Sequence, residues 1–148
     1  MIRVFLDANV YFAGCVSPSG ASAIILELAR RKRFQLVTSR LVLREAERNL
    51  RSKASRKTLQ AFHRFLQATD VVVAPSPEEK IVAQYETVIH PKDIPVLVAA
   101  LKAEVDYLVT LDRRHFLTKP VLALARRAKI LTPGDFLKSF VRHTKEAI

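Results

Sequence analysis

Short apolar runs alternate along the chain with longer segments in which apolar residues recur every three or four positions. The runs predict buried strands, and the recurring pattern predicts helices that bury one face. We expect five strands, the last at an edge of the sheet: Ile2–Leu6, Phe34–Thr38, Val71–Ala74, Tyr107–Leu111 and Lys129–Thr132. We expect helices over Ala21–Arg31, from Ser39 through Leu50, from Ser55 or Lys57 through Leu66, and over Glu78–Val88, Asp93–Ala103, Leu122–Arg127 and Pro133–Val141. Strands that alternate with helices are typical of an α/β fold, in which a central, mainly parallel sheet carries helices on both faces.

Length and composition are those of one globular domain. A chain of 148 residues buries about 70% of its unfolded surface, so we treat residues 1–148 as a single domain and expect residues 142–148 to fray. No apolar run approaches the roughly 20 residues of a membrane helix, and Asp7 and Asn9 interrupt what would be a signal peptide. We therefore expect a soluble, cytoplasmic protein with no membrane contact. Cys15 is the only cysteine, which excludes a disulfide within the chain and a cluster of thiolate metal ligands.

The chain is strongly basic. Lys and Arg number 25 against 14 Asp and Glu, which gives a net charge of +11 at pH 7. An excess of this size on a small domain creates an extended positive field that attracts polyanions. The alternative is a solvated surface that only favours solubility. We expect the partner to be a nucleic acid or an acidic protein.

Three aspartates stand where predicted strands end or a predicted helix begins. Asp7 follows the first strand, Asp112 follows the fourth, and Asp93 begins the helix between them. In a parallel sheet the carboxyl ends of the strands form the crevice that binds ligands, so these acids are expected to point toward one place. Each also has a structural interpretation. Asp93 is a good N-cap in front of Ile94-Pro95, and the other two could be turn residues that end strands.

The helix after the second strand offers a fourth acid. The stripe that this helix is predicted to bury consists of Leu43, Ala46 and Leu50. Glu45 lies at the border of that stripe and is the better inward candidate, whereas Glu47 lies further toward solvent. The alternative for Glu45 is a surface contact with Arg48 or Asn49.

Other catalytic chemistries find no matching motif. The histidines are scattered and lack the spacing of zinc ligands, so we expect surface or capping roles for His63, His90, His115 and His143. The chain has three glycines and lacks the glycine-rich loops that cradle nucleotides. A phosphatase that forms a phosphoaspartate usually has a second aspartate two residues after the first, where this chain has Asn9.

Four segments, in order along nearly the whole chain, resemble the motifs of the PIN-domain family, which includes the VapC-type toxins of toxin-antitoxin pairs and many nucleases. Phe5–Val10 is similar to the opening motif, and Glu45 with Leu50 to a helix-borne glutamate and its following leucine. Lys92–Leu101 and Leu108–Asp112 are similar to the third and fourth motifs. The fourth motif is often Thr-Gly-Asp, and this chain has a leucine in place of the glycine. The resemblance implies a three-layer α/β/α fold, a metal-dependent ribonuclease and frequent homodimers.

The chemistry of the acids agrees with this resemblance. Carboxylates crowded at strand ends repel one another and resist ionisation, so a divalent cation would stabilise them, and a set of oxygen ligands suits Mg²⁺ or Mn²⁺ better than zinc. We interpret Asp7, Asp93 and Asp112 as direct or water-bridged ligands, and Glu45 as a ligand or a water-orienting base. Hydrogen bonds that position a carboxylate or a phosphate are expected from Asn9 and Thr110. The residues expected to contact RNA phosphates are Arg48, Arg51, Arg113 and Arg114.

The sequence therefore predicts a metal-dependent endoribonuclease that hydrolyses RNA phosphodiester bonds. As the resemblance implies, it could be the toxin of a toxin-antitoxin pair, inhibited by an acidic antitoxin and assembled as a homodimer. The alternative is a non-catalytic RNA-binding or regulatory module of the same fold, whose acids serve only the structure.

Overall fold

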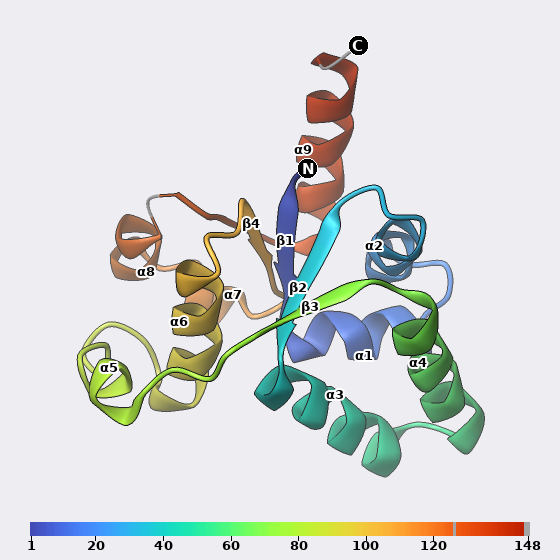
Figure 1. Ribbon diagram of the computed structural model, residues 1–148, viewed down its shortest axis with the longest axis horizontal. Coiled ribbons are helices and arrows are strands. Elements are labelled where there is room, and N and C mark those ends of the chain that lie inside the picture. The colour runs from blue at the N-terminus through green and yellow to red at the C-terminus, as the bar shows by residue number, and fades with distance from the viewer. Residues whose placement is uncertain (126, 147–148) are drawn as a thin grey trace.

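The computed structural model describes residues 1–125 and 127–146, which contain one sheet of five parallel strands. The strands are β1 (Arg3–Leu6), β2 (Gln35–Ser39), β3 (Val71–Ala74), β4 (Tyr107–Val109) and β5 (Lys129–Leu131). Their order in the sheet is β3-β2-β1-β4-β5, so β3 and β5 form the two edges (Figure 1). The register places Leu6 beside Val109, where β1 and β4 end together. The predicted parallel sheet, with its last strand at an edge, is confirmed.

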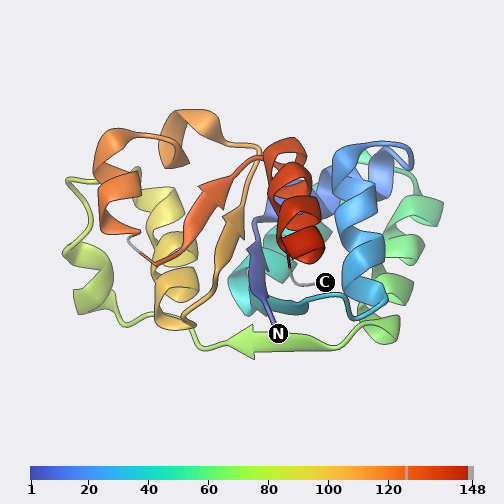
Figure 2. The ribbon, with the colours of Figure 1, turned by 90° about the horizontal axis from the view of Figure 1, so that it is seen from above.

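Helices cover both faces of this sheet. Across the described ranges they are α1 (Ala8–Val16), α2 (Ala21–Arg30), α3 (Arg40–Lys53), α4 (Arg56–Ala68), α5 (Glu79–Ala83), the 3-10 helix η1 (Pro91–Asp93), α6 (Ile94–Lys102), α7 (Arg113–Phe116), α8 (Lys119–Leu124) and α9 (Pro133–Glu146). Figure 2 shows α2, α4 and α9 on one side of the strands and α5, α6 and α8 on the other, which is the predicted three-layer arrangement. Among the described residues no single helix is long and apolar enough to cross a membrane, and only α1 and α2, bent by 101° at the break between them, meet that test as a pair.

The core lies between the sheet and these helices. Residues 4–6 of β1 have no exposed surface, as expected for a parallel strand covered on both faces. On the α9 side, the ring of Phe136 meets the rings of Phe34 and Tyr107 edge to face, with centroids 5.8 and 5.1 Å apart. This packing holds the amino ends of β2 and β4 against α9.

Two helices that the sequence pattern did not predict begin directly after strand-end acids. α1 starts after Asp7 and buries Ala8, Val10 and Tyr11, while most of its other residues are half-buried. Because α1 is apolar on every side, it shows no periodic stripe that could have predicted a helix. α7 starts after Asp112 and spans only four residues, too few to show a period.

Two predicted elements are shorter than expected. The helix predicted over Glu78–Val88 ends at Ala83, because α5 buries none of its residues and the chain continues as tight turns stabilised by hydrogen bonds between residues three apart. The fourth strand ends at Val109, earlier than expected. Thr110 still donates its backbone N–H to β5, and its side chain donates to Asp7 at the carboxyl ends of the strands.

Two helices near the carboxyl end also differ from the prediction. The helix predicted over Leu122–Arg127 begins earlier, at Lys119, where the hydroxyl of Thr118 accepts a hydrogen bond from a backbone N–H of the first turn. The predicted end of this helix includes Arg126, which lies outside the described residues. α9 continues past Val141 to Glu146, so residues 142–146, where fraying was expected, are helical in the structure, and residues 147–148 lie outside the described part.

Candidate active site

A small cavity lies at the carboxyl edge of the sheet, where β1 and β4 end. Its volume is about 180 Å³, and the predicted site residues that line it are Asp7, Asn9, Glu45, Asp93 and Asp112. It is also lined by residues that the sequence analysis had not assigned to a site: Ala8, Asn49, His90, Lys92 and His115. Four other cavities, of about 430, 420, 290 and 210 Å³, are larger, but none of them is lined by more than one acid. The fold therefore brings acids from four separate segments together at one place.

Asp7 is held in place by a network of hydrogen bonds at the end of β1. One carboxylate oxygen accepts from the backbone N–H of Ala8, at 2.8 Å, and the other accepts from the hydroxyl of Thr110, also at 2.8 Å. The side-chain amide of Asn9 lies 3.4 Å from both the Asp7 carboxylate and the Thr110 hydroxyl. The Thr110 hydroxyl in turn accepts from the backbone N–H of Asp112, at 3.0 Å. Thr110 thus joins the acid after β1 to the acid after β4.

Burial changes the pKa of two of the acids. It raises the pKa of Asp7 from 3.8 to about 6, against the opposing effect of its hydrogen bonds from Thr110 and Ala8. Burial also raises the pKa of Asp93, with a further contribution from the charge of Asp112, while His115 and His90 lower it. Repulsion between the acids was expected to be the cause, but in both cases burial has the larger effect.

Glu45 faces the cavity from α3. This helix buries Val42 fully, whereas Leu43, which was predicted for the buried stripe, is only partly buried. Glu45 and Asn49 are one turn apart and both line the cavity. The Glu45 carboxylate lies 3.9 Å from the Lys92 ammonium, so among the described residues its charged partner comes from η1 and not from its own helix.

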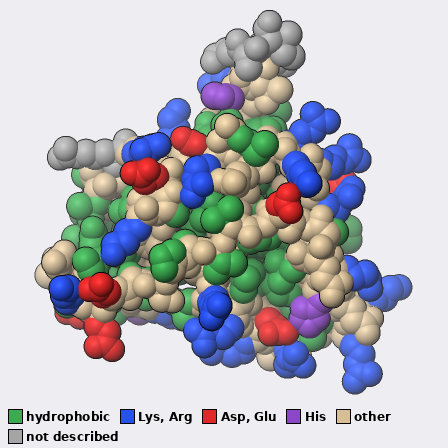
Figure 3. Space-filling view, viewed as in Figure 1, with side chains coloured by type: hydrophobic (Ala, Val, Ile, Leu, Met, Phe, Trp, Pro, Cys, Tyr) green, Lys and Arg blue, Asp and Glu red, His purple; other side chains and the backbone are tan. Residues whose placement is uncertain are grey.

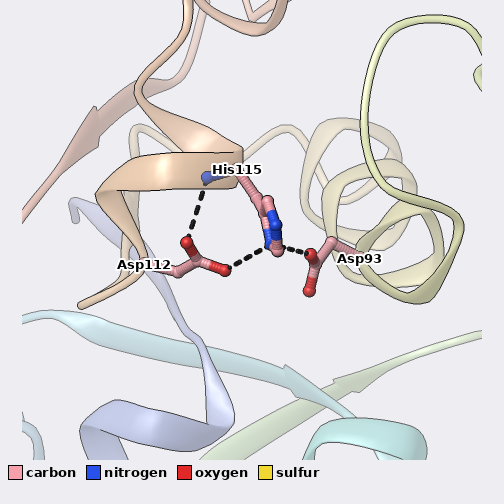
Figure 4. A group of neighbouring side chains, drawn as sticks. All are labelled: Asp93, Asp112 and His115. Atoms are coloured by element: carbon pink, nitrogen blue, oxygen red, sulfur yellow. Dashed lines mark hydrogen bonds and ion pairs between the residues drawn. The ribbon is translucent and has the colours of Figure 1, made fainter.

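Asp93 and Asp112 face each other across the side chain of His115 (Figure 4). Asp112 caps α7, since one of its oxygens accepts from the backbone N–H of His115 at 3.0 Å. Asp93 makes no side-chain cap hydrogen bond to α6, so the expectation that it caps this helix was wrong. His115 Nδ1 lies 2.9 Å from Oδ2 of each aspartate, and the expected surface or capping role for this histidine was also wrong.

The acids and His115 fit a divalent cation. Asp93, Asp112 and His115 each present one ligand atom, and these atoms lie within 4.8 Å of one another. Asp7 stands beside this group with hydrogen bonds to both of its oxygens, an arrangement suited to a water-bridged contact. The expected ligand set contained only oxygen, and the sequence analysis missed the histidine. Its position three residues after Asp112, on the first turn of a capped helix, was the available signal.

The four arginines predicted to contact RNA do not line the cavity. Arg48 is exposed on α3, and Arg51 pairs with Glu47 at 3.3 Å. Arg113 and Arg114 are exposed on α7 and line neighbouring grooves of about 430 and 290 Å³. Among the described residues, the lysine or arginine side chain that lines the cavity is that of Lys92.

Many exposed basic side chains lie on α3, which lines the site, and on α4, which packs against α3. In Figure 3 Lys and Arg side chains gather along the lower edge of the face shown, over these two helices. The exposed basic residues of α3 and α4 are Arg40, Arg44, Arg48, Arg51, Lys53, Arg56, Lys57 and Arg64. The cluster at residues 30–33 lies instead at the end of α2 and in the connection to β2, near the amino ends of the strands. There Arg30 and Arg31 pair with Glu27.

Leu111 fits the loop between β4 and Asp112 without strain. Among the described residues that carry a side chain, only Lys32 and Glu104 have a positive φ. The backbone at Leu111 therefore does not need a glycine. Its N–H donates to the side chain of Asn9 at 3.1 Å, which links this loop to the start of α1.

Comparisons with known proteins show the family of the chain and solved structures with the same fold. The family model described as PIN domain matches residues 3–114. The structure is similar to PAE2754 from Pyrobaculum aerophilum, with a TM-score of 0.62 and 17% identity over 95% of this chain and 96% of that one. It is also similar to VapBC2 from Rickettsia felis, solved bound to a DNA fragment from their promoter, with a TM-score of 0.62 and 15% identity over 87% of this chain and 98% of that one. No curated protein sequence matches the chain.

Proposed function

Because the chain belongs to the PIN-domain family, we propose that it is a metal-dependent endoribonuclease that hydrolyses RNA at the cavity on the carboxyl edge of the sheet. PIN domains are generally nucleases. The observation that carries the proposal is the convergence of Asp7, Glu45, Asp93 and Asp112 on this one cavity. Four acids from separate segments have no common structural task, but together they suit the binding of a divalent cation and a phosphodiester.

In this proposal each acid has a distinct task. A bound Mg²⁺ or Mn²⁺ would lower the pKa of a water molecule and stabilise charge on the scissile phosphate. Asp93 and Asp112 would hold the ion, because both carboxylates converge on the same point beside His115. Asp7, held by Thr110 and Ala8, would orient a water molecule. Glu45 would accept or position a proton of that water.

The basic surface supports a polyanionic substrate. The net charge of +11 attracts RNA over long distances, and Lys92 can meet a phosphate at the cavity itself. We propose that the arginines of α3 and α7, two helices that each contribute to the lining of the cavity, contact neighbouring phosphates. We propose that α3 and α4 form the main RNA path, since many of the exposed basic side chains lie there.

We further propose that the chain is the toxin of a toxin-antitoxin pair and acts in the cytoplasm. This extends to the chain what is known of the family and the similarity to VapBC2. An acidic antitoxin would match the positive charge, and a basic side chain of that partner could take the place of the cation among the acids. We expect the toxin to form a homodimer. Light scattering of the purified protein at high micromolar concentration tests this expectation, and a monomer at every concentration would contradict it.

One observation favours an alternative function. Asp7 and Asp112 both cap helices, so each has a structural task that requires no metal. A non-catalytic RNA-binding or regulatory module with the same fold would keep them for that reason alone.

A single two-step experiment separates the two functions. The purified chain is mixed with labelled single-stranded RNA in EDTA, binding is measured, and excess Mn²⁺ is then added. The nuclease predicts binding in EDTA, followed by cleavage after the addition. Binding without cleavage in Mn²⁺ and in Mg²⁺ would support the non-catalytic module. Cleavage of single-stranded DNA but not of RNA would contradict the proposed substrate.

A further inference from the structure

His115 occupies the position between the two acids that are best placed to hold an ion. Its Nδ1 lies 2.9 Å from Oδ2 of Asp93 and 2.9 Å from Oδ2 of Asp112 (Figure 4). The three residues come from η1, from the loop after β4 and from α7. Nothing in their spacing along the sequence links the histidine to Asp93.

The contact is not explained by a hydrogen bond. His115 Nδ1 is buried, yet within the described residues it has no partner in the direction that an N–H donor of the ring requires. The two 2.9 Å distances therefore place Nδ1 against both carboxylates without the alignment of a hydrogen bond.

Two further contacts fix the imidazole in this position. The backbone N–H of His115 donates to the other oxygen of Asp112, at 3.0 Å. The ring stacks on that of His90, with centroids 5.0 Å apart and an angle of 21° between the planes. His90 is itself held, because its Nδ1 accepts from the backbone N–H of Lys92 at 3.2 Å. A ring fixed in this way presents its nitrogen at little entropic cost.

We propose that Nδ1 of His115 is a direct ligand of the cation held by Asp93 and Asp112, and that it makes the site prefer Mn²⁺ over Mg²⁺. This inference rests on the proposed function, because it concerns the ion of the same site. Mg²⁺ binds mainly oxygen and keeps several waters, whereas imidazole nitrogen is a ligand of first-row transition ions. One nitrogen among the ligands therefore shifts the selectivity of the site toward the transition ion.

The test compares His115→Phe with two matched controls. His115→Phe keeps an aromatic ring to stack on His90 but removes the nitrogen. His90→Phe changes the stacked ring without removing a proposed ligand, and His143→Phe changes an exposed histidine on α9. A second variant, His115→Gln, offers an oxygen donor if the aromatic variant does not fold. Folding of each variant is checked by urea unfolding in EDTA.

Pulsed electron paramagnetic resonance of bound Mn²⁺ gives the direct readout, because it detects a coordinated ¹⁴N nucleus without any substrate. We expect a nitrogen coupling in the wild type and in the His90 and His143 variants, and its loss in both His115 variants. The ratio of the Mg²⁺ to the Mn²⁺ dissociation constant, obtained by competition, is expected to fall about tenfold or more in the His115 variants.

The outcomes separate this inference from the proposed function. Mn²⁺ bound without a nitrogen coupling in the wild type, or a coupling that persists in His115→Phe, would overturn the ligand assignment, while metal-dependent RNA cleavage would leave the nuclease intact. An unchanged ratio of dissociation constants would overturn the selectivity. Absence of Mn²⁺ binding would overturn both the inference and the metal dependence of the proposed function.

Discussion

Asp7→Asn tests whether burial of this acid destabilises the fold in the absence of metal. Asp7 is only 6% exposed, and its pKa is raised from 3.8 to about 6. A shift of this size corresponds to about 3 kcal/mol between the charged and neutral forms. The folded state holds the proton more tightly than the unfolded state, so ionisation of Asp7 lowers stability. The protonated Asp7 therefore adds to the free energy of unfolding. This stabilisation is fully present below about pH 3.8 and is lost as the pH rises through about 6.

The asparagine removes this effect but keeps most of the local contacts. Its carbonyl oxygen can still accept from the backbone N–H of Ala8, and its amide can donate to Thr110. The Thr110 hydroxyl loses the oxygen to which it donated, which costs about 1 kcal/mol. In EDTA at pH 7.5 we therefore expect Asp7→Asn to be more stable than the wild type by about 2 kcal/mol.

Urea unfolding in EDTA at pH 7.5 and at pH 4 measures this difference. The advantage of the variant is expected to disappear at pH 4, where the wild type holds its proton. Asp70→Asn is the control, because Asp70 is exposed and its one ion pair within the described residues is with Lys32, and it should show no comparable gain at pH 7.5. An Asp7→Asn protein that is less stable at both pH values would refute the reasoning and identify Asp7 as a structural cap.

Three further changes separate structural from functional roles. Asp112→Ala should lower the free energy of unfolding in EDTA by about 0.5 to 2 kcal/mol through loss of the α7 cap, whereas Asp93→Ala should not, and equal losses would contradict the observed capping. Replacement of Arg113 and Arg114 by glutamate should reduce the slope of log RNA affinity against log salt concentration by about 0.7 per lost phosphate contact. An unchanged slope would mean that the RNA binds elsewhere. Gly14→Ala should destabilise the fold by about 1 to 3 kcal/mol, because the added carbon would lie 2.5 Å from the side chain of a core leucine in α2. Gly134→Ala, which meets no atom within 4 Å, should not, and similar melts for both glycine variants would show that α1 and α2 can separate.

The sheet and the four acids were predictable because both depend on local patterns. Central parallel strands are covered on both faces, so β1 and β4 are short apolar runs, and the residue after such a run lies at the ligand-binding edge. Asp7 and Asp112 could therefore be identified without knowing what surrounds them. Glu45 required only the helical period of α3, although the fully buried residue proved to be Val42 and not Leu43.

The remaining features depend on contacts between distant segments. His115 meets Asp93 only because α7 and η1 pack side by side at the edge of the sheet, and no spacing rule for metal ligands joins them. Lys92 reaches Glu45 because η1 also lies beside α3. Basic clusters are visible in the sequence, but whether a cluster borders the site depends on the direction of its helix. Residues 30–33 end α2 and lead into β2, so they lie near the amino ends of the strands, away from the site.

Whether the clustered acids form a catalytic metal site can be tested by an RNA-cleavage time course in Mn²⁺ for the wild type, Asp112→Asn and Asp70→Asn. Asparagine caps a helix as well as aspartate does, so Asp112→Asn should fold normally while the ion loses a charged ligand. We expect cleavage to fall about a hundredfold or more in Asp112→Asn and to stay at the wild-type rate in Asp70→Asn. A folded Asp112→Asn protein that cleaves RNA as fast as the wild type would contradict the account.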